Sequence, residues 1–94
     1  MKELIKGGVI MYEIIGMNGN YKRLKLIGEM PAIFDNRQSF YGKARIFEDE
    51  EGNKYLMSYS TIVSECKNGK IKHYGKYSQT TSRHQREFEK QFSK

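Results

Sequence analysis

The dipeptide Asn68-Gly69 constrains the fold of this chain more than any other pair of residues. A two-residue type I′ turn needs positive φ at both central positions, and Asn followed by Gly adopts it readily. The flanking segments 61–67 and 70–76 are therefore predicted to be antiparallel strands, with Lys67 facing Lys70. In this register two opposite charges, Glu65 and Lys72, face each other, and so do an aliphatic and an aromatic side chain; both kinds of pair stabilise a sheet. The further pairs are Cys66 with Ile71, Glu65 with Lys72, Ser64 with His73 and Val63 with Tyr74.

The rest of the chain is predicted to form further strands and one terminal helix. Apolar, β-branched or alternating patterns indicate strands over 9–15, 21–27, 40–48 and 54–60, with a turn over 16–20 and a loop over 31–38. The helix is expected to begin at an N-cap, Ser78 or Thr80, and to run to Phe92. The predicted fold class is α+β: a mainly antiparallel sheet of about five hairpin-connected strands, curled or barrel-like, with one C-terminal α-helix.

Helical spacing separates the two faces of that helix. One face is expected to dock on the sheet, through Thr81, Gln85, Phe88 and Phe92. The other face is expected to remain in water, with Arg83, Arg86, Glu87 and Lys90.

The length of 94 residues suits one domain, 1–94. Residues 1–8 are short, charged and end in Gly-Gly, which is typical of a flexible leader. Hydrophobic residues make up 37% and charged residues 30%, so we expect a soluble globular chain. No run approaches the roughly 20 apolar residues of a spanning helix, and no secretory signal is recognisable. We therefore expect a cytoplasmic protein without a membrane partner; monomer and dimer both remain open.

Positive charge is concentrated in the second half of the chain, and the net charge is +6. Residues 1–53 hold eight Lys or Arg and eight Asp or Glu, whereas residues 54–94 hold nine and three. Between Glu65 and Glu87 there is no acid, but there are six cations: Lys67, Lys70, Lys72, Lys76, Arg83 and Arg86. Such a surface attracts nucleic acid or an acidic protein.

The start of the helix is a candidate anion-binding corner. It offers four hydroxyls where an N-cap needs one acceptor, beside unpaired helix N–H groups and the cation Arg83. The alternative is a simple cap, with Arg83 solvated and His84 packed against Phe88. Tyrosines interleaved with lysines suit base stacking, although tyrosine is also common in strands. The candidate nucleic-acid or anion-binding residues are Lys70, Lys72, Lys76, Tyr77, Ser78, Thr80, Thr81, Arg83, His84 and Arg86.

No catalytic or metal-binding motif stands out. Ser82, His84 and Glu87 would point to different faces of one helix, so we expect no catalytic residue and no enzyme. The single cysteine, Cys66, is expected to be a buried thiol, because a metal site there would need His73 and His84 to converge on it with carboxylates. The acidic segment 48–51 is typical of a solvated hairpin tip. No metal or cofactor is expected.

Two segments carry a resemblance to a known group of proteins. They are Ser58-Tyr59-Ser60-Thr61 and the run from Tyr77 to His84, Tyr-Ser-Gln-Thr-Thr-Ser-Arg-His. Together they resemble short uncharacterised proteins associated with phages and mobile elements, in which a Ser-Tyr-x-Thr strand precedes a Tyr-Ser-x-Thr-Thr-x-Arg-His helix start. The similarity covers roughly residues 40–92. It implies a phage or prophage context, and hence a host cytoplasm, but no catalytic residue.

Two functions follow as expectations. The first is a small phage-type protein that binds nucleic acid through the basic hairpin and the helix N-terminus, with little base discrimination because no groove-reading motif is present. The alternative is a protein-binding inhibitor or modulator of a host factor, such as a defence protein. The partner is accordingly nucleic acid or a host or phage protein.

Overall fold

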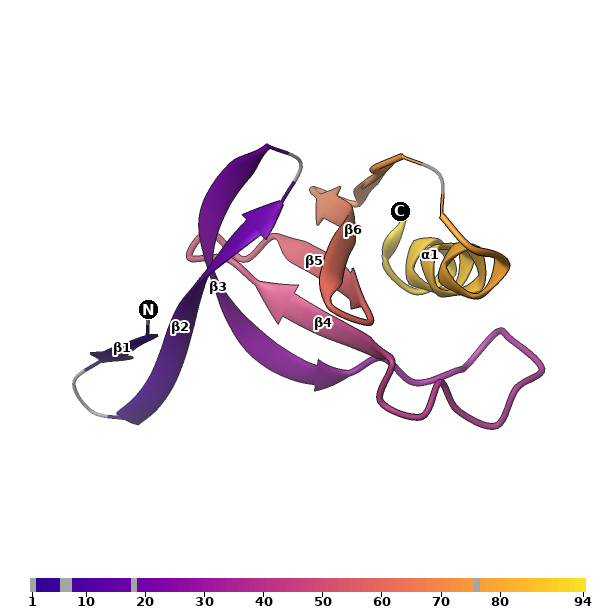
Figure 1. The fold of residues 1–94 in the computed structure, drawn as a ribbon, viewed down its shortest axis with the longest axis horizontal. Helices are drawn as coiled ribbons and strands as arrows, with labels where there is room; N and C mark the ends of the chain where they lie inside the picture. Colours follow the sequence, from indigo (N-terminus) through magenta and orange to yellow (C-terminus); the bar gives the residue numbers. More distant parts are fainter. Residues whose placement is uncertain (1, 6–7, 18, 76) are drawn as a thin grey trace.

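The computed structural model describes residues 2–5, 8–17, 19–75 and 77–94, and this part of the chain forms seven strands and one helix (Figure 1). In chain order these are β1 (Lys2–Ile5), β2 (Gly8–Met17), β3 (Asn20–Glu29), β4 (Ala44–Glu48), β5 (Lys54–Ser58), β6 (Thr61–Lys67), β7 (Lys70–His73) and α1 (Gln79–Phe92). Every strand pairs antiparallel with the next one in sequence, in the order β1-β2-β3-β4-β5-β6-β7. The predicted antiparallel sheet with one C-terminal helix is confirmed, although about five strands was too few.

The sheet curls without closing. Its edges are β1 and β7, which do not pair with each other among the described residues. The β2–β3 hairpin bends toward β6 across the curl, on the side of the central strands that lies away from α1 (Figure 1). The sheet is therefore an open meander and not a barrel.

The β6–β7 hairpin has the register that its turn predicts. Asn68 and Gly69 have φ of 54° and 78°, as a type I′ turn requires. The four predicted pairs nearest the turn are all present, and the amide of Tyr74 donates to the carbonyl of Val63 at 2.9 Å. The second strand ends at His73 and not at residue 76.

The bounds of four other strands differ from the sequence prediction. β4 begins at Ala44 and not at Phe40, because Tyr41 and Gly42 have positive φ (53° and 75°) and form a turn. β5 ends at Ser58 for the same reason, since Tyr59 has φ of 58°. β2 and β3 are longer than expected and turn more tightly, with Met17 paired to Asn20. β1 lies within residues 1–8, which were predicted to be a flexible leader without a strand.

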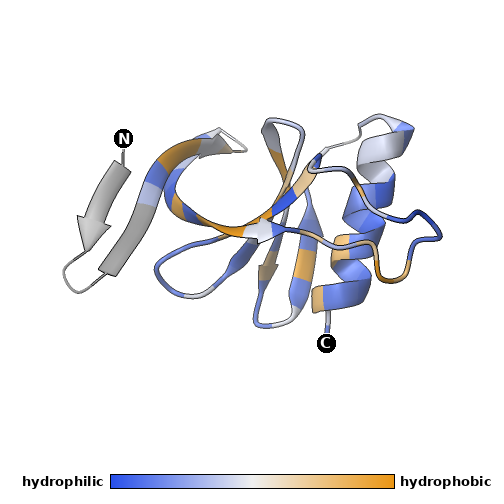
Figure 2. Ribbon diagram, turned by 90° about the horizontal axis from the view of Figure 1, so that it is seen from below, coloured by the Kyte–Doolittle hydropathy of each residue, from blue (hydrophilic) through white to orange (hydrophobic). Residues whose placement is uncertain are grey.

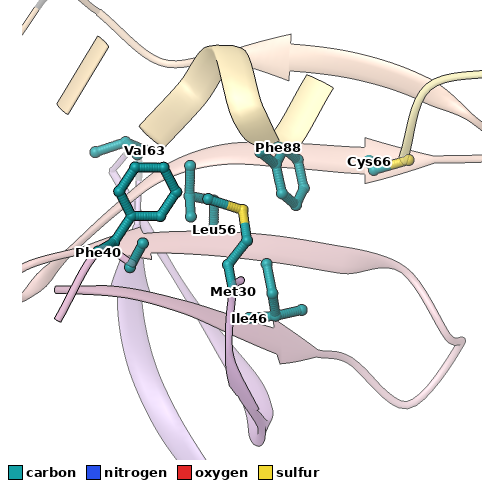
Figure 3. Packing of buried hydrophobic residues seen from close by; sticks show 8 residues of the cluster. Met30, Phe40, Ile46, Leu56, Val63, Cys66 and Phe88 are labelled. Atoms are coloured by element: carbon teal, nitrogen blue, oxygen red, sulfur yellow. The ribbon is translucent and has the colours of Figure 1, made fainter. Parts of the chain in front are cut away.

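The central strands bury side chains on both faces. The helix-side cluster lies between the sheet and α1, where Phe88 points toward Leu56 and Met30 (Figure 3). Its buried members are Met30, Phe40, Ala44, Ile46, Leu56, Val63, Cys66 and Phe88. The hairpin-side cluster lies on the opposite face, under β2 and β3, and contains Leu24, Phe47, Tyr55, Met57, Ile62 and Tyr74. Because successive residues of a strand point to opposite faces, the adjacent Ile62 and Val63 serve different clusters, as do Met57 and Leu56 on β5.

Helix α1 docks by the predicted face. Ser78 is its N-cap, accepting from the amide of Thr81 at 3.2 Å. Of the four residues expected to dock, Thr81, Gln85 and Phe88 are buried and Phe92 packs partly buried against the helix-side cluster. Figure 2 shows α1 as mostly hydrophilic with short apolar stretches, in keeping with a one-sided contact. No helix in the described part of the chain is long and apolar enough to cross a membrane.

Glu87 is the exception on this helix, because it is 1% exposed and not solvated as expected. Its carboxylate accepts hydrogen bonds from the backbone amides of Ile33 and Phe34, at 3.0 and 3.1 Å. The side-chain amide of Gln91, one turn later, donates to it at 2.6 Å. These bonds hold the loop after β3 against the helix, and they satisfy a carboxylate that burial would otherwise disfavour.

Candidate anion-binding site

The histidine at the start of α1 is buried, with 1% of its surface exposed. Its Nδ1 atom lies 2.8 Å from Oγ of Ser58 at the end of β5, and that Oγ lies 3.0 Å from Oγ1 of Thr81. Its ring packs edge-on against Phe40 at 4.7 Å between centroids, a different ring from the Phe88 expected of a simple cap. His84 is therefore fixed in position by its neighbours on two sides.

The environment keeps this histidine neutral. Burial lowers the pKa of His84, and the nearby charge of Arg37 lowers it further, while Asp35 opposes them. At pH 7 the ring is thus neutral and carries one proton. Its hydrogen-bond partners decide whether Nδ1 or Nε2 holds that proton. Because Nδ1 is engaged by Ser58, Nε2 is the ring nitrogen that can meet a ligand.

A pocket of about 230 Å³ adjoins His84, and we call it the helix-start pocket. Three cations line it and no carboxylate does. The lining residues are Arg37, Ser39, Phe40, Tyr41, Lys43, Tyr59, Thr80, Arg83 and His84. Three cations in so small a space, beside a helix N-terminus, favour a negatively charged occupant.

Two exposed tyrosines stand at this pocket. Tyr41 is 71% exposed and Tyr59 is 48% exposed, and both have a left-handed backbone conformation, Tyr41 in the turn before β4 and Tyr59 in the turn after β5. The amide of Tyr59 donates to the carbonyl of Lys43 at 2.7 Å, which joins the two turns. Nζ of Lys43 lies 5.9 Å from the centroid of the Tyr59 ring, so a cation and an aromatic face are presented together.

The three cations of the pocket are not equivalent. Arg83 binds Asp35 with two hydrogen bonds, Nη2 to Oδ1 at 2.8 Å and Nε to Oδ2 at 3.2 Å, and also reaches Oδ1 of Asn36 at 3.0 Å. This pairing lowers the pKa of Asp35 and raises that of Arg83. Arg37 and Lys43 form no ion pair with a carboxylate among the described residues. They supply the charge that is left for a ligand.

The structure brings together only part of the predicted site. Thr80, Arg83 and His84 line the helix-start pocket, while Ser78 caps the helix and Thr81 lies behind His84. Tyr77 is exposed but borders a different cavity of about 510 Å³, together with Tyr21 and Tyr74. Arg86 is on the outer face of α1, Lys70 and Lys72 are on β7, and Lys76 falls outside the described residues.

The sheet separates the cations of the hairpin from those of the helix. His73 faces α1, where its Nε2 lies 2.9 Å from Oε1 of Glu89, so its neighbour Lys72 projects from the opposite face. Lys72 is paired across the hairpin with Glu65, and Nζ of Lys67 also lies 3.7 Å from that glutamate. The described cations of the acid-free interval thus do not form a single patch.

Six of the nine lining residues were not among the predicted site residues: Arg37, Ser39, Phe40, Tyr41, Lys43 and Tyr59. They lie in the loop after β3 and in the two turns that the alternating pattern had assigned to strands. The pair Tyr41-Gly42 was the available signal, because a glycine there permits the turn that ends the pattern.

The cysteine and the histidines have separate partners. Cys66 is buried, as expected, and its thiol donates to the carbonyl of Phe92 at 3.6 Å. His73 contacts Ser64 and Glu89, whereas His84 contacts Ser58. Within the described ranges no three His, Cys, Asp or Glu side chains form a group that could hold a metal ion.

These observations define a small α+β protein with a candidate anion-binding pocket at the start of its only described helix. The chain belongs to a family of unknown function, DUF8033, whose model matches residues 28–94. The matched region contains every residue of the helix-start pocket and of the helix-side cluster. Neither the curated proteins nor the solved structures contain a match to this chain.

Proposed function

We propose that this chain is a small non-enzymatic protein of phage or prophage type that binds single-stranded nucleic acid in the host cytoplasm. The supporting observation is the helix-start pocket, which combines three cations, no lining carboxylate and two exposed tyrosines. Phosphate binding and base stacking are the two contacts that proteins use on single strands without reading sequence.

Each part of the pocket suits one part of a nucleotide. The guanidinium of Arg37 can bind a phosphate with two parallel hydrogen bonds, and Lys43 adds a point charge beside it. The rings of Tyr41 and Tyr59 are exposed enough for bases to stack on them, at about 1–3 kcal/mol per base. Because stacking accepts any base, we expect little sequence preference.

The position of the Ser58 hydroxyl, which contacts His84, favours a binding function over catalysis. Ser58 is 3% exposed, and its Oγ is enclosed by His84 and Thr81. Among the described residues no carboxylate is hydrogen-bonded to His84, so the base lacks the orienting partner of a catalytic triad. The arrangement suits a rigid wall of a binding pocket.

A salt titration tests the proposal. Fluorescently labelled single-stranded DNA and RNA should bind at about 50 mM salt, with log affinity falling by about 0.7 per log salt for each phosphate contacted. The double variant Arg37→Gln/Lys43→Gln should reduce that slope by about 1.4, since it removes two contacts. Binding that is absent at ~50 mM salt would refute the proposal.

The hairpin lysines provide a matched control. Lys70→Gln/Lys72→Gln also removes two positive charges, but from exposed positions on the other face of the sheet. It should change the slope much less than the pocket variant does. Equal effects of the two doubles would mean that only the total charge matters and that the pocket is not the site. Thermal unfolding of both variants checks that neither has lost its fold.

One further observation favours the alternative, a protein-binding inhibitor or modulator of a host factor. Ile33 and Phe34 are 61% and 55% exposed, although Glu87 fixes their backbone in place. A rigid loop that presents two apolar side chains is suited to a protein partner. If so, a partner recovered from host extract by the unmodified chain should be lost with Phe34→Ser, and its retention would contradict this alternative.

A further inference from the structure

The size of the helix-start pocket restricts what part of a strand it can hold. Its volume is about 230 Å³, which is below the roughly 300–1,000 Å³ of pockets that enclose drug-sized ligands. A compact charged group fits such a volume, while the sugar and base attached to it must lie outside, along the exposed tyrosines. A single phosphate group is therefore the natural occupant.

The charge of the pocket indicates which kind of phosphate. Arg83 is neutralised by Asp35, so Arg37 and Lys43 leave an excess of about two positive charges. An internal phosphodiester carries one negative charge, whereas a phosphate monoester carries about −1.5 to −2 at neutral pH. The pocket thus matches a phosphate at the end of a strand better than one within it.

The hydrogen bonds that reach Nδ1 of His84 also favour a phosphate in the pocket. Ser78 Oγ donates to Thr81 Oγ1 at 3.4 Å. The Thr81 hydroxyl can then donate to Ser58 Oγ, and the Ser58 hydroxyl can donate to Nδ1 of His84. In that relay Nδ1 is an acceptor, so the proton of the neutral ring must be on Nε2. His84 then offers the pocket an N–H donor from a buried and rigid position, which is what a phosphate oxygen requires.

We infer that the helix-start pocket binds the terminal phosphate monoester of a nucleic-acid strand, with Arg37, Lys43 and His84 holding the phosphate. This inference rests on the proposed function and adds to it that the protein recognises an end. The neighbouring nucleotide stacks on Tyr59 or Tyr41, which is why a strand end is preferred over a phosphorylated peptide.

Competition among matched oligonucleotides tests the inference. The probes are one short sequence with a 5′-phosphate, with a 3′-phosphate, or with hydroxyls at both ends, measured by fluorescence anisotropy at one salt concentration. One phosphorylated form should bind about tenfold more tightly than the hydroxyl form, the effect of one added charge-assisted hydrogen bond. Arg37→Gln should remove that preference, whereas Arg86→Gln, with the same loss of charge outside the pocket, should keep it.

Four outcomes are informative. Equal affinity for phosphorylated and hydroxyl ends overturns the inference while leaving the proposed function in place, whereas no binding of any oligonucleotide overturns both. Inorganic phosphate or a nucleoside monophosphate that competes as well as the phosphorylated strand overturns the assignment to a strand end. A phosphoserine peptide that competes as well overturns the assignment to nucleic acid. Lys43→Gln, an exposed substitution, repeats the test if Arg37→Gln fails to fold.

Discussion

Replacing Glu87 by alanine should destabilise this protein far more than an ordinary surface change on the helix. The carboxylate accepts from two backbone amides, those of Ile33 and Phe34, and from the side chain of Gln91. Hydrogen bonds to a charged group contribute about 1.5–3 kcal/mol each. Gln91 keeps its hydrogen bond to the carbonyl of Pro31, and the freed loop can turn its amides toward water, so we count only the two amide bonds, at the low end of the range, and expect a loss of about 3 kcal/mol.

The measurement is equilibrium unfolding by urea and by heat. For a domain of this size, 1 kcal/mol corresponds to a shift in Tm of about 4–8 °C, so Glu87→Ala should lower Tm by about 12–24 °C. Hydrogen exchange at the amides of Ile33 and Phe34 should accelerate as well, because these are the donors that lose their acceptor.

Glu89→Ala is the matched control. It removes the same charge two residues along the helix, but Glu89 is exposed and its carboxylate has one hydrogen-bond partner, His73, within the described part of the chain. An exposed ion pair contributes about 0–1 kcal/mol. If Glu87→Ala and Glu89→Ala destabilise equally, the buried carboxylate does not hold the loop and our account of that contact is wrong.

Three further predictions concern the fold. Gly69→Val should cost more than the ~1 kcal/mol of an ordinary glycine change, since it places a β-branched residue at φ of 78°; unchanged thermal stability would contradict the turn. Phe88→Ala should cost about 3–5 kcal/mol in urea unfolding, because the ring is 0% exposed, and a loss below ~1 kcal/mol would mean that α1 is not docked through it. Burial opposes ionisation of Asp49, but hydrogen bonds from Asn53 and Tyr55 hold its pKa at about 2, below the ordinary 3.8. A depressed carboxyl pKa stabilises the fold above pH ~4, so about 2 kcal/mol should be lost as pH falls from about 4 to 2, and Asp49→Asn should lack this pH dependence.

Local signals explain what the sequence predicted well. The β6–β7 register follows from Asn68-Gly69 alone, because a two-residue turn fixes every pair that follows it. The docking face of α1 follows from helical spacing, and its cap from one hydroxyl at Ser78. These features depend on residues that are close together in the chain.

Long-range contacts explain what was missed. A glutamate on a helix is usually solvated, and the amides that bury Glu87 lie more than 50 positions earlier in the chain. The pocket combines the loop after β3 with two turns at non-glycine positive φ, Tyr41 and Tyr59, which side chains seldom adopt. The cations between Glu65 and Glu87 do not form one surface for a related reason. Side chains alternate along β7, so Lys72 projects from the face opposite α1.

The boundary of the family match divides the two hydrophobic clusters unequally. A chain that began at Gly28 would keep all eight buried members of the helix-side cluster, but it would lose Leu24 and the flanking Ile15 and Met17 from the other face. Phe47 and Met57 would then be open to water across the middle of the sheet. A form of this domain without the β2–β3 hairpin would therefore need another cover for this face of the sheet, either a different segment of its own chain or a second copy.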